Sequence, residues 1–270
     1  MVGVSHECDH PPEARELPCV TRPTLELYGL AGGEIEDRVA AAAASGRPLY
    51  ELDLVQIRDL APDLVVAQDV CRVCAVPAEQ VLDRVGEARI ARQHPHTLED
   101  VLREIAELAA LCDADAEPLL GSLRRRIAAA SAARQGQRPV RGVFLEWLDP
   151  PYPAGHWTPD LLRLAGIDDP LARPGAPSRA VAWEAVEAIR PELLLVAPCG
   201  FGLERAREEA ERQAARLEAV GASRIAVFDG SGYFNRPGPR LVHSLEMLVR
   251  EAASIMPPAV ERGNTGWRDG

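Results

Sequence analysis

The segment "AEPLLGSLRRRIAAASAARQGQRP", residues 116–139, decides how the chain is organised. It begins as a long helical pattern and ends in a polar break. No strand pattern lies next to it, whereas strands and helices alternate on both sides. We therefore predict a connector between two lobes. The expected division is an α/β lobe at 1–115, a connecting helix at 116–138, a second α/β lobe at 139–255 and a tail at 256–270.

The segments before the connector alternate between strand and helix patterns. Thr97, followed three residues later by Asp100, has the spacing of a helix N-terminal capping box. Short apolar runs predict strands, the one at 63–67 being a buried strand. The expected strands are 2–4 and 63–67, and the expected helices are 33–46, 77–86 and 96–112.

The segments after the connector show the same alternation, which is typical of parallel sheets in α/β proteins. We therefore expect two Rossmann-like α/β lobes joined by one long helix. The expected strands of the second lobe are 140–147, 192–197 and 224–228, and its expected helices are 158–167, 183–189, 204–221 and 239–254.

Composition excludes several classes of function. The formal net charge is −11 and no long basic run exists, so nucleic acid is not an expected partner. All 30 basic residues are Arg, which excludes Schiff-base catalysis and a Walker-A lysine. No apolar stretch of about 18 residues is present to span a membrane.

The first ten residues, "MVGVSHECDH", do not have the pattern of a secretory signal. Six cysteines in a chain of this length do not make a disulfide framework. We therefore expect a cytoplasmic protein with free thiols. A longer natural N-terminus would make it periplasmic or membrane-associated instead.

Unusual residues gather in loops that follow the predicted strands. Open α/β sheets bind ligands at the carboxyl ends of their strands. We therefore expect these loops to line one cleft between the lobes. The five loops are 5–12, 68–77, 146–157, 198–202 and 229–240.

Aromatic residues are concentrated in the second-lobe loops, which hold half of the chain's twelve Phe, Trp and Tyr residues. Aromatic walls suit a large, flat, partly apolar ligand, with Arg236 and Arg240 available for its anionic edges. Alternatively, these rings pack the hinge and the loop bases. The six are Trp147, Tyr152, Trp157, Phe201, Tyr233 and Phe234.

Five strings resemble the cobalamin-binding subgroup of the periplasmic-binding-protein family, the vitamin B12-type substrate-binding proteins of ABC importers. They are "VGVSHECDHPP" (2–12), "PDLVVAQDVCRVCAVP" (62–77), "LEWLDPPYPAGHWTPDL" (145–161), "PCGF" (198–201) and "DGSGYFNRPGPRLV" (229–242).

The resemblance implies two lobes on a single connecting helix, with cobalamin or a related corrinoid held between them as cargo. No GxSxG or HExxH motif is present, and three residues from different loops such as Asp149, His156 and Cys199 are easily found by chance, so we expect no enzymatic activity and no catalytic cofactor. The expected ligand-binding residues are His6, Asp9, Gln68, Cys71, Cys74, Glu146, Trp147, Asp149, His156, Trp157, Cys199, Phe201, Tyr233, Phe234, Arg236 and Arg240.

The chain departs from the family pattern in two ways. A strand–helix unit usually precedes the segment that matches 2–12, so the first lobe is expected to lack its opening unit. Importer-linked members also dock on a permease through one glutamate in each lobe. Glu79 is the candidate in the first lobe, whereas Asn235 stands where the second is expected.

Cys71 and Cys74 have the spacing of half a zinc site, but no second such pair follows. A metal-binding or metal-sensing protein that combines them with Cys199 and His156 is the alternative function. Redox chemistry is disfavoured because the predicted helix starts after Cys74 rather than at Cys71. We expect these two cysteines to line the pocket. If a residue of the cleft coordinates the corrinoid cobalt, His6 and His156 are the candidates.

Overall fold

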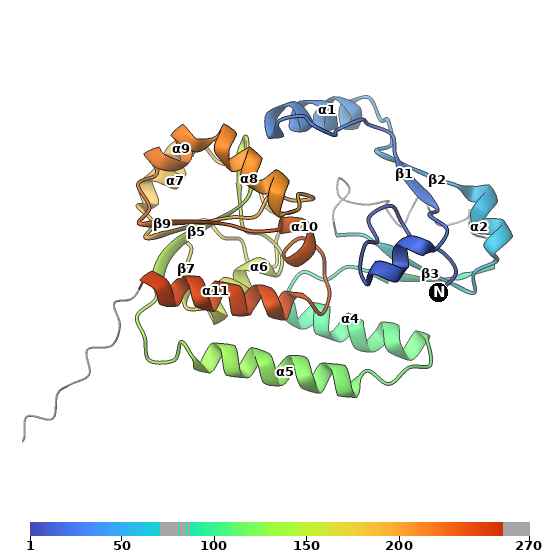
Figure 1. The fold of residues 1–270 in the computed structure, drawn as a ribbon. Helices are drawn as coiled ribbons and strands as arrows, with labels where there is room; N and C mark the ends of the chain where they lie inside the picture. The colour runs from blue at the N-terminus through green and yellow to red at the C-terminus, as the bar shows by residue number, and fades with distance from the viewer. Residues whose placement is uncertain (71–80, 82–84, 86, 256–270) are drawn as a thin grey trace, which may run out of the picture.

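The computed structural model describes residues 1–70, 81, 85 and 87–255, which form two lobes (Figure 1). The first lobe contains a 3-10 helix, η1 (Pro12–Glu16), and the strands and helices β1 (Thr21–Pro23), α1 (Gly32–Ala44), β2 (Tyr50–Leu52), α2 (Leu54–Leu60), β3 (Leu64–Gln68) and β4 (Arg89–Gln93). Two helices, α4 (Leu98–Leu111) and α5 (Glu117–Ala132), lead to the second lobe.

Within its described residues, the second lobe contains six helices arranged around a sheet. Its strands are β5 (Val140–Leu148), β6 (Pro151–Pro153), β7 (Ile167–Asp168), β8 (Leu193–Val196) and β9 (Arg224–Val227). Its helices are α6 (Thr158–Leu164), α7 (Trp183–Ile189), α8 (Leu203–Arg212), α9 (Ala214–Ala219), α10 (Gly230–Tyr233) and α11 (Leu241–Ile255).

The described part of the first lobe has small sheets. β1 pairs antiparallel with β2, and β3 pairs parallel with β4. Two predictions need correction here. Val4 makes only an isolated bridge with Cys19 instead of a strand at 2–4, and the β3 strand is not buried, since Val66 is half-exposed. The helix predicted at 77–86 lies almost entirely outside the described residues.

The connection between the lobes is a pair of helices. Thr97 Oγ1 accepts from the Asp100 backbone N–H while the Asp100 carboxylate accepts from that of Thr97, so the predicted capping box starts α4. Leu102 of α4, Leu120 and Leu123 of α5, and Val242 of α11 share one buried cluster. α4 therefore packs with the second lobe. The domain boundaries expected from the sequence stay a proposal. The packing of α4 favours ending the first lobe at the start of α4 rather than at residue 115.

A mixed sheet forms the centre of the second lobe, in the order β6-β5-β8-β9, with β7 pairing the start of β5. β5, β8 and β9 are parallel, and β6 is antiparallel to β5. All four residues of β8 are fully buried because helices cover both faces of the sheet. α6 and α11 pack on one face, and α7, α8 and α9 pack on the other.

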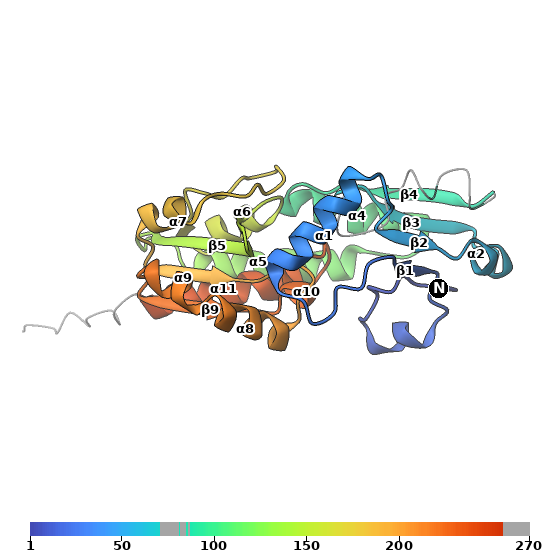
Figure 2. The same cartoon turned by 90° about the horizontal axis from the view of Figure 1, so that it is seen from above.

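Three expected helices differ in detail. The helix expected at 158–167 ends at Leu164, and Ile167 belongs to β7. The segment 204–221 forms two helices, α8 and α9, which meet at Gln213. The helix expected at 33–46 forms as α1, but it packs against the second lobe rather than only its own: Ile35 is buried with Phe201 and Ala206. Figure 2 shows α1 lying across the space between the lobes. Within the described part of the chain, no helix has the length and apolarity needed to cross a membrane.

Candidate ligand-binding site between the lobes

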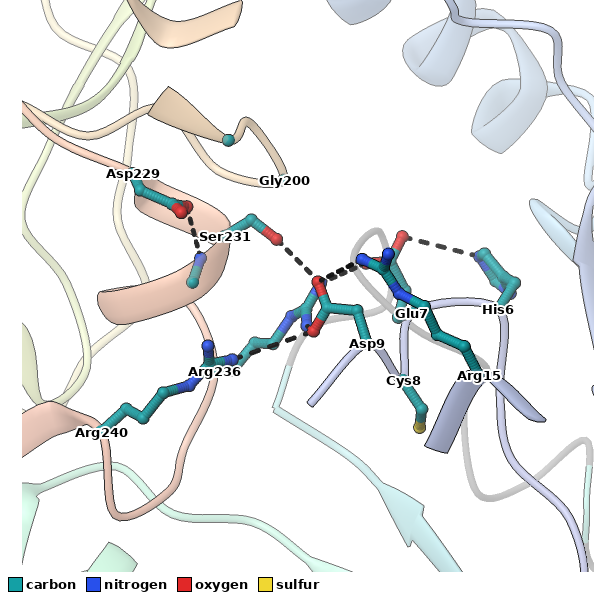
Figure 3. A pocket seen from close by; sticks show the side chains of 12 residues that line it. His6, Glu7, Cys8, Asp9, Arg15, Gly200, Asp229, Ser231, Arg236 and Arg240 are labelled. Atoms are coloured by element: carbon teal, nitrogen blue, oxygen red, sulfur yellow. Dashed lines mark hydrogen bonds and ion pairs between the residues drawn. The ribbon is translucent and has the colours of Figure 1, made fainter. Parts of the chain in front are cut away.

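A pocket of about 540 Å³ opens where the first loop of the chain meets two loops of the second lobe (Figure 3). The second-lobe loops follow β8 and β9, at the carboxyl ends of parallel strands, where α/β folds place ligands. The lining residues are His6, Glu7, Cys8, Asp9, Arg15, Gly200, Gly202, Asp229, Ser231, Gly232, Arg236 and Arg240.

Arg236 is the centre of the pocket and joins the two lobes. Its Nη1 donates to Asp9 Oδ1 at 2.6 Å, and its Nη2 donates to Glu7 Oε2 at 2.8 Å and to Ser231 Oγ at 2.7 Å. Figure 3 shows the arginine reaching from the second lobe toward the two acidic side chains of the first. A guanidinium has a planar fork of donors that suits oxyanions, so this is an anion-binding arrangement.

Two further arginines face the same carboxylate. Arg240 Nη2 lies 3.9 Å from Asp9 Oδ1, and Arg15 Nη2 lies 4.0 Å from Asp9 Oδ2. The Arg240 guanidinium also stands 5.7 Å from the ring centre of Tyr233. Asp9 is therefore the point where cationic side chains of both lobes converge.

His6 forms the first-lobe wall of the pocket. Its Nδ1 is 2.6 Å from Thr21 Oγ1, its ring centre is 5.2 Å from that of Tyr50, and its Nε2 is 3.7 Å from Glu7 Oε1. Burial lowers the pKa of His6, while the Glu7 carboxylate acts in the opposite direction. A neutral imidazole held in this way retains a lone pair for a ligand.

Glycines leave the second-lobe side of the pocket open. Gly200 has a φ of +75°, and a Cβ atom at Gly200 or at Gly202 would meet nothing within 4 Å. Asp229 Oδ1 accepts from the Gly232 backbone N–H at 2.6 Å, and a Cβ atom at Gly232 would lie 2.6 Å from that carboxylate. The loop after β9 therefore keeps its shape only with glycine at that position.

Two of the predicted ligand-binding aromatics are core residues instead. Trp157 is 4% exposed and its Nε1 donates to the Phe234 carbonyl at 2.8 Å. Phe234 is 1% exposed and packs against Phe144 and Phe228. Both rings are taken up by the second lobe's main core, because the loops that hold them turn back over the sheet. The alternative that aromatic rings of these loops serve packing rather than ligand binding therefore applies to Trp157 and Phe234.

The other aromatics also lie outside the pocket lining. Trp147 and Phe201 stack edge to face at 5.2 Å beneath α1, and Phe201 is buried. Tyr152 donates to Glu36 Oε1 of α1 at 2.8 Å. Tyr233 is partly buried against the core. The first lobe's helix α1 thus covers three of the aromatic residues that we expected to face a ligand, namely Trp147, Tyr152 and Phe201.

The remaining predicted residues have structural partners. Glu146 Oε2 accepts from the Gly155 backbone N–H, Gln68 Oε1 accepts from that of Val70, and Asp149 lies beside Gly33. Cys199 is half-buried on the loop after β8, next to the pocket. His6, Asp9, Arg236 and Arg240 are the predicted residues that line it.

His156 belongs to a cluster of histidines between the lobes. Its ring centre is 5.9 Å from that of His96, which is 4.3 Å from that of His94. Burial lowers the pKa of His156, and the two neighbouring histidines lower it further. None of these three histidines lines the pocket, so His156 is not among the residues grouped there with the arginines.

Sequence reasoning did not name eight residues of the pocket lining, which are Glu7, Cys8, Arg15, Gly200, Gly202, Asp229, Ser231 and Gly232. Glu7, Cys8 and Ser231 lie in loops that the sequence singled out, next to residues that it named. Arg15 lies on η1 and is brought to the pocket by a helix that no pattern predicted. Only the three-dimensional contact with Asp9 identifies it.

The metal-binding alternative gains no support. Within the ranges that the structure describes, no group of three or more His, Cys, Asp or Glu side chains is arranged to hold a metal ion. Cys71 and Cys74 lie outside those ranges, as does Glu79. Asn235 is described, and its side-chain oxygen is buried, 2.7 Å from where a Cβ atom at Gly230 would lie.

Solved structures with the same arrangement are periplasmic binding proteins. The chain matches the periplasmic vitamin B12 binding protein BtuF of Vibrio cholerae with a TM-score of 0.63 and 21% identity, over 94% of this chain and 88% of that one. A periplasmic heme-binding protein from Pseudomonas aeruginosa gives 0.67 and 20%, over 95% and 86%. The heme-binding protein RhuT from Roseiflexus sp. RS-1 gives 0.66 and 21%, over 94% and 90%. No protein-family model and no curated protein matches the chain.

These comparisons correct the expected location. A cytoplasmic protein was expected from the first ten residues, whereas the structures that share the fold are periplasmic binding proteins, which contradicts that expectation. The prediction was wrong because it rested on one end of the chain, while the fold is a property of nearly all of it. The chain has the two-lobed α/β fold of periplasmic binding proteins.

Proposed function

We propose that this chain is the ligand-binding component of an ABC importer and that it holds a corrinoid such as cobalamin, or a related macrocycle, between its lobes. The observation that carries the proposal is the pocket of about 540 Å³ that both lobes line. Proteins with this fold include ones named for vitamin B12 and for heme, which supports a macrocyclic cargo. The sequence motifs favour the corrinoid.

The chain acts by binding rather than by catalysis under this proposal. The groups that line the pocket are arginines, carboxylates and glycine backbone, which suit recognition of a polar edge. An importer also implies a permease as partner and a place of work outside the cytoplasm. Glu79 is the proposed docking residue of the first lobe, whereas Asn235 replaces the carboxylate expected in the second lobe.

Titration of the purified protein with cobalamin, cobinamide and haemin, followed by visible absorbance and calorimetry, tests the proposal. We expect one equivalent of at least one of them to bind with a Kd in the micromolar range or below. Failure of all three at tens of micromolar would remove the proposed function.

A pair of variants at one position locates the site. Gly202→Trp places an indole in the pocket, where a Cβ atom meets nothing within 4 Å, so it should abolish binding without unfolding the protein. Gly202→Ala adds only a methyl group in the same open space and should bind as the unchanged chain does. Equal binding by both variants would place the ligand elsewhere.

A further inference from the structure

The arginine that marks the pocket is already hydrogen-bonded by the protein itself. Both terminal nitrogens of Arg236 donate hydrogen bonds, to Asp9, Glu7 and Ser231, at 2.6 to 2.8 Å. Two of these three acceptors are carboxylates from a loop more than 220 positions away in the sequence. An anionic ligand that takes the Nη1 and Nη2 donors now facing Asp9 and Glu7 must therefore replace these carboxylates.

The ion pairs that Arg236 makes with Glu7 and Asp9 are exposed enough for a ligand to replace them. The side chains of Arg236, Glu7 and Asp9 are 30%, 47% and 35% exposed. Ion pairs with this much water contact contribute little to stability, because solvent compensates their loss. Releasing Glu7 and Asp9 into water is correspondingly cheap, unlike the release of a buried carboxylate.

The charges of the pocket balance without a ligand. Arg15, Arg236 and Arg240 face Glu7, Asp9 and Asp229. The Asp229 carboxylate accepts a hydrogen bond from the Gly232 backbone N–H. In the contacts described above, Glu7 and Asp9 contact the second lobe only through its arginines. An entering anion restores the balance when these two carboxylates leave, and it then faces at least Arg236 and Arg240.

We propose that Glu7 and Asp9 are an internal competitor for the arginines of the second lobe, and that the cargo carries a carboxylate or similar oxyanion that displaces them. The empty protein holds its first loop on the second lobe through Arg236. Binding transfers that arginine to the ligand and frees the loop. This inference rests on the function proposed above and adds the chemical class of the group that the pocket recognises.

The test uses the full chain and two pairs of probes that differ in carboxylates. Haemin has two propionate groups that its dimethyl ester masks, and cobyric acid has a carboxylate where cobinamide has an amide. Binding of all four is measured by calorimetry to the unchanged chain, to Glu7→Gln/Asp9→Asn and to Arg236→Gln. The control is Glu13→Gln/Glu16→Gln, which makes the same change in net charge at exposed positions of η1.

Glu7→Gln/Asp9→Asn should tighten binding of the carboxylate-bearing member of a pair by about five- to tenfold, since two competing pairs are removed. Arg236→Gln should weaken it by about tenfold or more, because a charge-assisted hydrogen bond is lost. Binding of the uncharged member should change less than about twofold in both variants. The control should match the unchanged chain.

Backbone amide exchange of residues 5–12 supplies a second reading that needs no ligand. Exchange should be faster in Glu7→Gln/Asp9→Asn than in the control, because the loop is no longer held on the second lobe. Circular dichroism confirms that each variant is folded.

The outcomes separate the two proposals. If no probe binds any variant, the proposed function fails and the inference fails with it. If probes bind but Glu7→Gln/Asp9→Asn affects carboxylate-bearing and masked probes alike, the proposed function stands and the internal competitor is wrong.

Discussion

Two adjacent glycines at the start of α1 fit against carboxylates of the second lobe. The Gly32 backbone N–H donates to Glu209 Oε1 at 3.1 Å, and a Cβ atom at Gly32 would lie 2.7 Å from that oxygen. Glu209 is 2% exposed and has no room to move. A Cβ atom at Gly33 would lie 2.7 Å from Asp149 Oδ2, but Asp149 is exposed and can rotate away.

Gly32→Ala should therefore lower the free energy of unfolding by about 1–3 kcal/mol, the usual cost of overpacking. Gly33→Ala, the matched control, should be neutral or stabilising by up to about 1 kcal/mol, because alanine favours the helix. Equilibrium urea unfolding measures both. Equal effects would mean that α1 does not dock on Glu209 in solution.

His156 should make stability depend on pH. Its pKa is lowered from 6.5 by burial and by His96 and His94, so the folded protein binds the proton less tightly than the unfolded chain. The full stability contribution of the neutral ring is present above pH 6.5 and is lost as the pH falls below that value.

The variant His156→Asn isolates this effect, because asparagine tolerates the φ of +51° found here. Between pH 7.5 and 5, the loss in free energy of unfolding should be smaller for the variant than for the unchanged chain. The pH series of urea midpoints measures the difference. Parallel curves for the two proteins would show that another group carries the acid sensitivity.

At the scale of elements, α1 is the piece whose position sequence patterns do not predict. Its helical periodicity is visible, yet the face that it buries contacts the second lobe through Ile35, Phe201 and Ala206. Ile35→Ala should cost about 2–4 kcal/mol in the free energy of unfolding, from lost burial and the cavity left behind. Ile225→Ala, at a half-exposed isoleucine on β9, is the control and should cost less than about 1 kcal/mol.

Amide exchange in the Ile35→Ala variant tells docking from simple loss of stability. Faster exchange should be confined to 32–44, while β5 and β8 keep their protection. Uniformly faster exchange across the chain would contradict the docked helix.

Elements with strong local signals were predictable. β5 and β8 are apolar runs between turn signals, and the capping box at Thr97 starts α4 where expected. β1 and β2 were missed because each is only three residues long and their central pair, Arg22 and Glu51, joins positions 29 apart in the sequence. Such short strands leave no periodicity to detect.

The site was predictable only in outline. Open α/β sheets bind ligands at the carboxyl ends of their strands, and this rule predicted which loops meet at the pocket. Arg236 and Arg240 were among the predicted ligand-binding residues. The contact between Arg236 and Asp9 joins positions 227 apart, and nothing in either local sequence encodes it. The aromatic residues misled because Trp157 and Phe234 sit in loops by sequence but in the core by packing.

The two lobes should differ in stability across the whole molecule. The second lobe's sheet is covered on both faces, and all four residues of β8 are fully buried. The buried cluster around β3 comprises Ile57, Ala67, Val81 and Val85 among the described residues, and Val66 of the same strand is 47% exposed. Because the first lobe buries less apolar area around β3, its free energy of local opening should be lower than that of the second lobe.

Hydrogen exchange of the unliganded protein tests this difference. Amides of β3 and β4 should exchange at least about tenfold faster than those of β5 and β8, because the first lobe opens by itself at a lower free energy. Amides of α4 should follow the second lobe, since Leu98 and Val101 lie in its main core. Equal protection in β3 and β8 would show that both lobes unfold as one unit, with the contacts of α1 and Arg236 strong enough to couple them.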